Sequence, residues 1–269
     1  MKVAAVQMVS GTRLDDNLAA ASRLIGQAAA QGCELVVLPE YFCLMGHQET
    51  DKLAFRENPG EGPIQAFLAQ AAREHGLWLV GGTLPLVAGD ERHVRNTSLA
   101  FSPAGECVAR YDKIHLFWFD NGQIRFEEAR VIEPGRQPVA FELRARDGEA
   151  WRVGMSVCYD LRFPELYRAL RADLLLVPSA FTFVTGQAHW GALLRARAIE
   201  NLAWVVAPAQ GGRHENGRRT WGHSMVVDAW GQVAACRADE GEGLVVAELD
   251  GERLRAWRRQ LPALEHRVL

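Results

Sequence analysis

The chain has 269 residues, of which 48% are hydrophobic and 23% charged, and its formal net charge is -3. This composition is typical of a globular protein and leaves no basic surplus for binding a phosphate backbone, so nucleic acid is not an expected partner. No apolar run reaches the ~18 residues of a membrane span, and the first residues lead into a strand-like run without a signal-peptide pattern, so we expect a cytoplasmic protein away from the membrane.

Strands and helices alternate along the first third of the chain, because short β-branched runs are each followed by a segment with helical spacing of its apolar residues. In chain order we expect a strand at 2–8, a helix capped by Asp15 or Asp16 and ended by Gly32, a strand at 34–39, a helix at 63–75 and a strand at 77–84.

The rest of the chain is richer in strands. A Pro-Ala-Gly turn joins two strand-like runs and predicts an antiparallel hairpin, and a Pro in a first helical turn marks a later helix. We expect the hairpin at 96–113, a polar loop at about 120–137, a strand at 151–160 that ends at Cys158, a helix at 164–171, a strand–helix–strand unit at 173–210, two paired strands at 224–231 and 244–250, and a helix at 252–260.

No low-complexity linker and no short-period repeat interrupts this order, so we expect one domain over residues 1–269. Strands that alternate with helices need covering layers. The predicted architecture is therefore an α/β fold with mixed sheets between helices.

The five cysteines are odd in number, widely spaced and without a Cys-x-x-Cys pair, which argues against a disulfide framework and against a zinc site. They are Cys33, Cys43, Cys107, Cys158 and Cys236. We expect most of them to be small buried residues. Neither a metal nor an organic cofactor is expected.

Three reactive side chains stand where apolar runs stop. Glu40 follows LVVLP, Lys113 closes ARYDK, and Cys158 ends VGMSV. Ligand crevices form at the carboxyl ends of strands, so these groups are candidates for one site. Each has a structural alternative: Glu40 could be a solvated loop acid, Lys113 a surface lysine and Cys158 a buried thiol.

The surroundings favour the functional interpretation of all three. The chain turns after Cys158 towards the helix that starts at Pro164, so a thiolate there would be stabilised by unpaired helix-terminal amides. Apolar neighbours on both sides of Glu40 would desolvate a carboxylate that acts as a general base. The bulky segment IHLFWF is unusual beside a solvated Lys113.

The segments LPEYF, YDKIHLF and SVCYDLRFPELYR resemble the three signature segments of the carbon–nitrogen hydrolase, or nitrilase, superfamily, in the same order. The resemblance covers essentially the whole chain, because GHSMVVDAWG is similar to the C-terminal part of that family. It implies a four-layer αββα sandwich. It also implies a homodimer, or a larger homo-oligomer, formed by stacking sheet against sheet.

The same resemblance implies an amidohydrolase that cleaves a C–N bond of a small carboxamide through a thioester. Cys158 would attack the carbonyl, Glu40 would move the protons, and Lys113 with the backbone N–H of Tyr159 would hold the oxyanion. A second glutamate is expected in RFEEARVIEPG, where the register favours Glu128 over Glu127, to position the lysine and the substrate; a solvated loop acid is the alternative.

Within the family, the segments SAFTFVTGQAHWGALLRARAIEN and AQGGRHENGRRTWGHSMVVDAWG resemble the deaminated glutathione amidases, with the ω-amidases close by. Both branches imply a small 2-oxo amide that carries carboxylates. Arg162 would bind such a carboxylate, or would instead pair with Glu165. Thr185, His189 and Arg213 are further candidates for substrate binding.

Other possibilities remain. Trp118 stands where the branch has an aspartate after His-Leu-Phe, so we expect a different pocket wall. A nitrile or N-carbamoyl substrate would keep the family and change the reaction. A Cys–His hydrolase would need His115, His189 or His223 as its base, and a noncatalytic binding protein could use the same fold.

Overall fold

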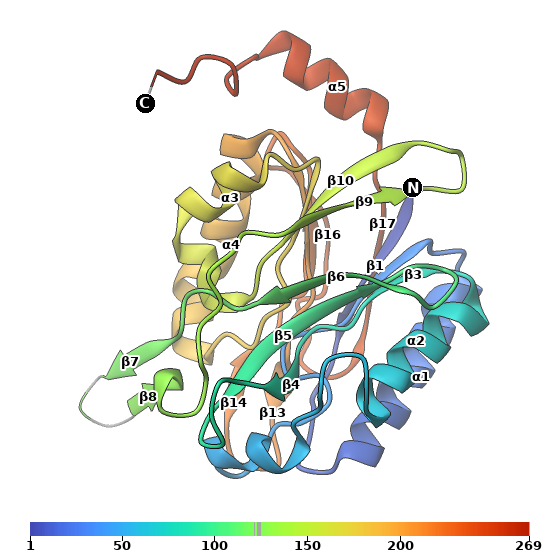
Figure 1. Ribbon diagram of the computed structural model, residues 1–269. Coiled ribbons are helices and arrows are strands. Elements are labelled where there is room, and N and C mark those ends of the chain that lie inside the picture. The colour runs from blue at the N-terminus through green and yellow to red at the C-terminus, as the bar shows by residue number, and fades with distance from the viewer. Residues whose placement is uncertain (121, 123–124, 269) are drawn as a thin grey trace.

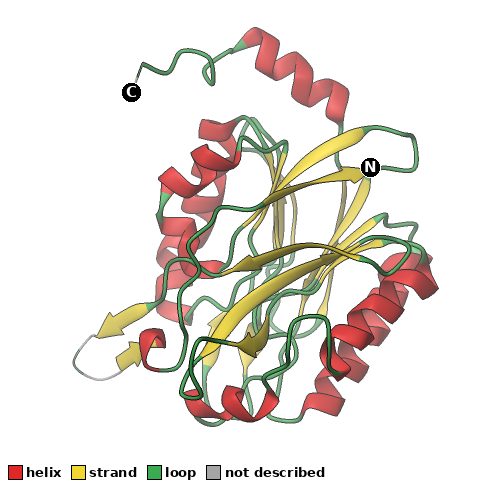
Figure 2. Ribbon diagram, viewed as in Figure 1, coloured by secondary structure: helices red, strands yellow, loops and turns green. Residues whose placement is uncertain are grey.

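Two β-sheets face each other in the computed structural model, which describes residues 1–120, 122 and 125–268 (Figure 1). Helices cover the outer face of each sheet (Figure 2). The seven-stranded sheet contains β1 (Lys2–Gln7), β2 (Leu35–Val37), β3 (Trp78–Val80), β4 (Leu84–Val87), β5 (Val94–Phe101), β6 (Cys107–Asp112) and β17 (Gly243–Glu248). The six-stranded sheet contains β9 (Ala140–Arg144), β10 (Ala150–Met155), β11 (Leu174–Leu176), β12 (Trp204–Ala207), β15 (Met225–Val227) and β16 (Val233–Cys236).

The helices and two small hairpins complete the fold. The α-helices are α1 (Leu14–Ala30), α2 (Pro63–His75), α3 (Pro164–Leu170), α4 (Phe183–Asn201) and α5 (Gly251–Gln260), and the 3-10 helices are η1 (Glu49–Phe55), η2 (Glu128–Arg130) and η3 (Cys158–Arg162). The hairpins pair β7 (Trp118–Asp120) with β8 (Arg125–Glu127), and β13 (Gly211–Arg213) with β14 (Arg219–Trp221).

Successive side chains of β1 alternate between two cores, which shows how the layers form. Val3 and Ala5 join the core between the two sheets, whereas Ala4 and Val6 belong to the core that the seven-stranded sheet shares with α1 and α2. Successive strand residues point to opposite faces, so a fully apolar strand buries both. With α3 and α4 outside the other sheet, the result is the predicted αββα sandwich (Figure 1).

Both sheets are mixed, as expected. The strands β1, β2 and β3 are parallel, and β5 and β17 run antiparallel to their neighbours. In the other sheet β10, β11 and β12 are parallel, with β9 and β15 antiparallel to them. The predicted hairpin at 96–113 is confirmed as β5 and β6.

Three local predictions were wrong. Arg13 is the N-cap of α1, and Asp15 and Asp16 lie in its first turn, where carboxylates favour the positive end of the helix dipole. The expected loop at 120–137 includes β8 and η2; its residues 121, 123 and 124 lie outside the described part. The expected strand pair at 224–231 and 244–250 does not exist, because β15 pairs with β12 and β16, while β17 pairs with β1 in the other sheet.

The predicted strand at 77–84 is interrupted after β3 for a steric reason. Gly82 has a φ of 49°, and a Cβ on it would lie 2.0 Å from the carbonyl oxygen of Pro39. Only glycine permits this approach. The loop before β4 therefore packs against the segment that carries Glu40, and Thr83 Oγ1 accepts a hydrogen bond of 2.9 Å from the N–H of Tyr41.

None of the helices in the described ranges is both long enough and apolar enough to cross a membrane.

Candidate active site

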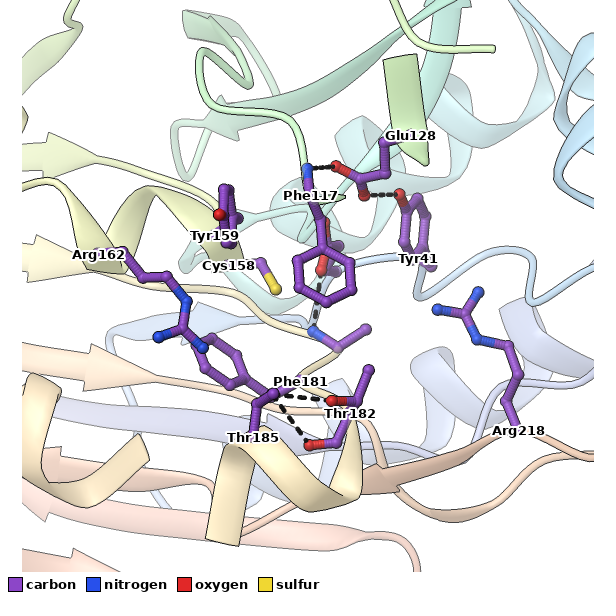
Figure 3. A pocket seen from close by; sticks show the side chains of 12 residues that line it. Tyr41, Phe117, Glu128, Cys158, Tyr159, Arg162, Phe181, Thr182, Thr185 and Arg218 are labelled. Carbon is purple, nitrogen blue, oxygen red and sulfur yellow. Dashed lines mark hydrogen bonds between the residues drawn. The ribbon is translucent and has the colours of Figure 1, made fainter. Parts of the chain in front are cut away.

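The three predicted reactive residues come from both sheets and meet at one pocket. Glu40 follows β2, Lys113 follows β6 directly, and Cys158 lies three residues beyond β10. The pocket and the open space at its mouth together enclose about 340 Å³. Its lining residues are Glu40, Tyr41, Phe117, Glu128, Cys158, Tyr159, Arg162, Ala180, Phe181, Thr182, Thr185 and Arg218 (Figure 3).

The Glu40 carboxylate is held from three directions and is only 1% exposed. Its Oε1 accepts hydrogen bonds from Lys113 Nζ at 2.9 Å and from Asn96 Nδ2 at 3.0 Å. Its Oε2 accepts one from the backbone N–H of Ala180 at 2.9 Å. These donors fix the orientation of the carboxylate, as proton transfer at a defined position requires.

Lys113 lies between two carboxylates. Besides its bond to Glu40, its Nζ donates to both oxygens of Glu128, at 3.0 and 2.8 Å. Burial alone would favour the neutral amine, but Glu128 and Glu40 raise the pKa of Lys113 well above its ordinary value. The ammonium is therefore a permanent positive charge in the site.

Glu128 occupies the position that the sequence favoured for the second glutamate, and Glu127 pairs instead with Arg125 at 2.8 Å. Each Glu128 oxygen has a partner besides the lysine. Oε1 accepts from the hydroxyl of Tyr41 and Oε2 from the N–H of Phe117, both at 2.7 Å. Figure 3 shows both contacts. Glu128 is thus a fixed anion beside the ammonium.

Cys158 begins η3 with a φ of 50°, a left-handed conformation that is uncommon for a residue with a side chain. Its N–H donates to the carbonyl of Pro178 at 3.0 Å. The strand expected to reach Cys158 ends at Met155, so the thiol stands on a separate turn. Strain of this kind is typical of residues whose side chain must point into a site.

Asp160 holds this turn in place, a role that was not predicted from the sequence. The carboxylate is fully buried and accepts from the N–H of Val157 at 2.8 Å and from the hydroxyl of Tyr111 at 2.7 Å. It also bonds to the N–H and Nδ1 of His115, at 3.0 and 2.7 Å. Asp160 thereby connects the cysteine turn to β6 and to the segment after Lys113.

The expectation of a stabilised thiolate was wrong. Burial and the negative charge of Glu40 raise the pKa of the Cys158 thiol well above its ordinary value, and Lys113 only partly opposes them. A hydrogen bond between the thiol and Glu40 acts in the same direction. Cys158 is therefore a neutral thiol at rest, with a carboxylate beside it that can accept its proton.

The predicted binding residues separate into two groups. Tyr159, Arg162 and Thr185 line the pocket, and His189 does not; its Nδ1 lies 3.3 Å from Nη1 of Arg162. Within the described part of the chain, Arg162 makes no ion pair with Glu165, so that alternative was wrong.

Arg218 and Phe117 line the pocket and were not predicted. Arg213, which was predicted, is exposed on β13 and lies outside the lining. The segment GGRHENGRR offers three arginines of the same kind, and no local signal distinguishes them. Trp118 is 57% exposed on β7 and does not line the pocket, so the predicted change in the pocket wall is not made by its side chain.

The three histidines considered as bases are occupied elsewhere. His115 bonds to Asp160 and stacks on Phe163, and Nδ1 of His223 lies 2.8 Å from the carbonyl oxygen of Trp221. Neither these nor His189 lines the cavity that Cys158 faces. The geometry therefore does not support a Cys–His mechanism. In the described ranges, no three His, Cys, Asp or Glu side chains come together as a metal site.

Comparisons with known proteins match almost the whole chain. A family model described as carbon–nitrogen hydrolase matches residues 2–259. The deaminated glutathione amidase of Synechocystis sp. is 42% identical over 98% of this chain and 97% of its own. Nit3 of Saccharomyces cerevisiae, a member of the nitrilase superfamily, superposes with a TM-score of 0.88 at 30% identity and covers 100% of this chain and 97% of its own.

A third similar protein bears on the cysteine. A glutamate-to-glutamine mutant of the amidase from Nesterenkonia sp., 29% identical, covers 97% of this chain and 95% of its own with a TM-score of 0.76. Its structure shows the acetamide moiety of fluoroacetamide added covalently at the active-site cysteine of that amidase.

The fold and these matches define the class: the chain belongs to the carbon–nitrogen hydrolase family, within the nitrilase superfamily. It is accordingly a hydrolase that acts on carbon–nitrogen bonds.

Proposed function

We propose that the protein is a cysteine-dependent amidohydrolase that cleaves a small 2-oxo amide through a thioester on Cys158. The observation that carries this proposal is the contact set of the pocket: a neutral thiol, a carboxylate that can take its proton, and a buried ammonium bonded to that carboxylate. An unactivated carboxamide is a poor electrophile, so its cleavage needs all three functions at one carbonyl.

In the first half-reaction the proton of Cys158 passes to Glu40 while Sγ forms a bond to the amide carbon. The C–O electron pair moves onto the oxygen. When the tetrahedral species collapses, the C–N bond breaks and Glu40 returns the proton to the departing nitrogen, which leaves as a neutral amine. A thioester then remains on Cys158.

In the second half-reaction water replaces the thiol as the nucleophile. Glu40 takes a proton from the water as its oxygen attacks the thioester carbon, and it returns the proton to Sγ when the C–S bond breaks. The products are the carboxylic acid and the free thiol. Glu40 thus serves both half-reactions as base and acid, and nothing is oxidised or reduced.

The oxyanion is assigned to Lys113 and to the backbone N–H of Tyr159. Tyr159 is the second residue of η3, where a helical N–H has no partner inside the helix. Lys113 uses two of its contacts on the two oxygens of Glu128. If the substrate oxygen replaces one of these two hydrogen bonds, Lys113 remains bonded to the carboxylates of both Glu40 and Glu128.

The substrate assignment rests on the relatives and on Arg162. Curated relatives at about 40% identity over 98% of the chain are deaminated glutathione amidases, and the corresponding substrate is a 2-oxo acid amide. Arg162 lines the pocket without a carboxylate partner in the described chain. A guanidinium in that state can bind a substrate carboxylate through two parallel hydrogen bonds.

The Glu40→Gln variant tests the mechanism. A reactive ester of the acyl group acylates a thiol with little help from a base, whereas hydrolysis of the thioester needs Glu40 to activate water. Intact-mass spectrometry should therefore detect an acyl adduct on Glu40→Gln that persists at least 100-fold longer than on the wild type, since a general base contributes roughly 10²–10⁴ in rate.

Cys158→Ser supplies the matched control, because it keeps the size of the side chain and should not form the thioester adduct. Wild-type rates of deacylation in Glu40→Gln would assign the base to another residue. The single domain over residues 1–269, the cytoplasmic location, the homo-oligomer and the lack of a cofactor stay predictions.

A further inference from the structure

Four polar residues occupy the same position relative to four strands. They lie three residues beyond β1, β2, β10 and β12, and they are Ser10, Glu40, Cys158 and Gln210. β1 and β2 are parallel neighbours in one sheet, and β10 and β12 are both parallel to β11 in the other. Side chains just beyond the carboxyl ends of parallel strands lie at one edge of a sheet. The proposed mechanism uses Glu40 and Cys158, and it gives Ser10 and Gln210 no role.

Gln210 contacts Glu40 from outside the pocket. The side chains of Gln210 and Ser10 are buried, and neither residue belongs to the pocket lining. Nε2 of Gln210 donates to the backbone carbonyl of Glu40 at 3.0 Å and to Ser10 Oγ at 2.8 Å, and its Oε1 accepts from the N–H of Ser10 at 3.0 Å. A carbonyl only accepts and a backbone N–H only donates, so these partners fix which way the amide points.

A second connection between Gln210 and Glu40 runs through the backbone. The N–H of Gln210 donates to the carbonyl of Ser179 at 2.9 Å, and the N–H of Ser179 donates to the carbonyl of Pro208 at 3.0 Å. The next residue, Ala180, donates its N–H to Glu40 Oε2 at 2.9 Å. Gln210 therefore holds the main chain of Glu40 directly, and it holds the carboxylate of Glu40 through the segment that contains Ala180.

The carbonyl that Gln210 holds belongs to the peptide unit between Glu40 and Tyr41. The N–H of the same unit donates to Thr83 Oγ1 at 2.9 Å, so side chains from two other segments hold its two ends. Tyr41 has a φ of 57°, a left-handed conformation that costs free energy for a residue with a Cβ. Such a conformation persists only where the surrounding contacts hold it. Without them the backbone would relax, and the carboxylate of Glu40 would be displaced with it.

We propose that Gln210 is a positioning residue of the hydrolase. Its side-chain amide keeps the peptide unit between Glu40 and Tyr41 in the strained conformation, and it thereby keeps the Glu40 carboxylate where it can exchange a proton with Cys158 and then with water. The inference rests on the proposed function, because that function assigns the proton transfers to Glu40. Loss of the amide should slow the steps that need the base and leave the other steps at their usual rate.

The ester 4-nitrophenyl acetate separates the two kinds of step. Nitrophenolate is a good leaving group, so attack by the thiol of Cys158 on this ester depends little on the base, and the burst of nitrophenolate measures acylation. Hydrolysis of the acetyl thioester needs an activated water, and intact-mass spectrometry follows the loss of the acetyl group. The rate constant for this loss refers to acylated protein alone, so a smaller folded fraction does not change it.

Gln210→Met keeps the length of the side chain and removes its two N–H donors. Its acetyl group should be lost about 10- to 100-fold more slowly than that of the wild type, because displacement of a catalytic group by about 1 Å can cost 10²-fold. The burst of nitrophenolate should keep close to its wild-type rate. Thr83→Val removes the acceptor at the other end of the same peptide unit and should produce the same defect, which keeps the test decisive if Gln210→Met does not fold.

Gln65→Met is the matched control. Gln65 is also a buried glutamine outside the pocket lining, and its Nε2 donates to the carboxylate of Glu57 at 3.0 Å and to two backbone carbonyls just before α2. The substitution should therefore lower the free energy of unfolding and leave the rate of deacetylation unchanged.

The outcomes separate the inference from the proposed function. A Gln210→Met protein that loses its acetyl group at the wild-type rate, or a Gln65→Met protein that shares the defect, would overturn the inference alone. Equal losses in the burst and in deacetylation would do the same, because they indicate general damage to the site. A wild type without an acetyl adduct on Cys158, judged against Cys158→Ser, would overturn the thioester mechanism and with it the proposed function.

Discussion

Replacing Lys113 with Met tests whether the buried ammonium serves stability, catalysis or both. The side chain is fully buried and bonded to Glu40 and Glu128. Removing one partner from a buried ion pair costs about 3–5 kcal/mol, because the remaining charge stays without compensation. We expect Lys113→Met to lose about that much free energy of unfolding, and to lose at least 10²-fold in the rate of thioester formation.

The double variant Lys113→Met/Glu128→Gln separates the two losses. The introduced glutamine side chain would keep a carbonyl oxygen for the N–H of Phe117 and an amide donor for the hydroxyl of Tyr41, which contact the two Glu128 oxygens. It would also remove one of the two uncompensated charges. We therefore expect the double variant to regain part of the lost stability but none of the lost rate.

Urea unfolding and single-turnover acylation measure these two quantities on the same preparations. If the double variant recovered the acylation rate together with its stability, the ammonium would be needed only to neutralise Glu128. If Lys113→Met alone kept the wild-type unfolding midpoint, the assumed cost of uncompensated burial would be refuted.

The site and its surroundings support four further predictions. Cys158→Ser should fold and lose nearly all turnover, whereas Cys107→Ser and Cys236→Ser, at exposed positions, should keep it; a steady-state amide assay decides. Activity should survive EDTA and phenanthroline, and loss on chelation with recovery on added zinc would contradict the thiol mechanism. Asp160→Asn should lower kcat far more than it changes KM, since the buried carboxylate orients the cysteine turn without lining the pocket. Burial raises the pKa of Cys43 to about 12, whereas the pKa of the unfolded thiol is about 8.5. The protonated thiol therefore stabilises the folded protein fully below about pH 8.5, and this contribution is lost as the pH rises towards 12. In that window the free energy of unfolding, measured by urea midpoints, should fall less steeply in Cys43→Ala than in the wild type, by about 1.4 kcal/mol per pH unit.

The convergence of Glu40, Lys113 and Cys158 could be predicted because each residue stands at or soon after the end of a strand. The chain leaves a strand at Val37, Asp112 and Met155, and a polar side chain soon after such a point lies at the edge of a sheet. The layered architecture could also be predicted, because strands that are apolar on both faces need a covering layer on each side. Pairing between distant strands could not be predicted. β17 pairs with β1, about 240 residues away, whereas sequence patterns indicate pairing only between strands that follow each other in the chain.

Arg218 illustrates what local sequence leaves undetermined. Arg213 and Arg219 are opposite each other in the β13–β14 ladder and are exposed, while Arg218 stands just before β14 and lines the pocket. Adjacent residues in an extended segment point to opposite sides, so a shift of one position decides which arginine lines the pocket. The hairpin register sets that position, and the segment GGRHENGRR fits more than one register.

The protonated thiol also follows from the charges brought together by the fold. Glu40, Lys113 and Glu128 carry a net charge of one negative unit, and a thiolate at Cys158 would add a second in a buried site. Attack with transfer of the proton to Glu40 removes the charge of the base as the oxyanion forms, so the net charge stays constant. A fixed cation between the two carboxylates then needs little rearrangement to stabilise the new anion. The same constancy holds when water attacks the thioester, which explains how one glutamate can serve both half-reactions.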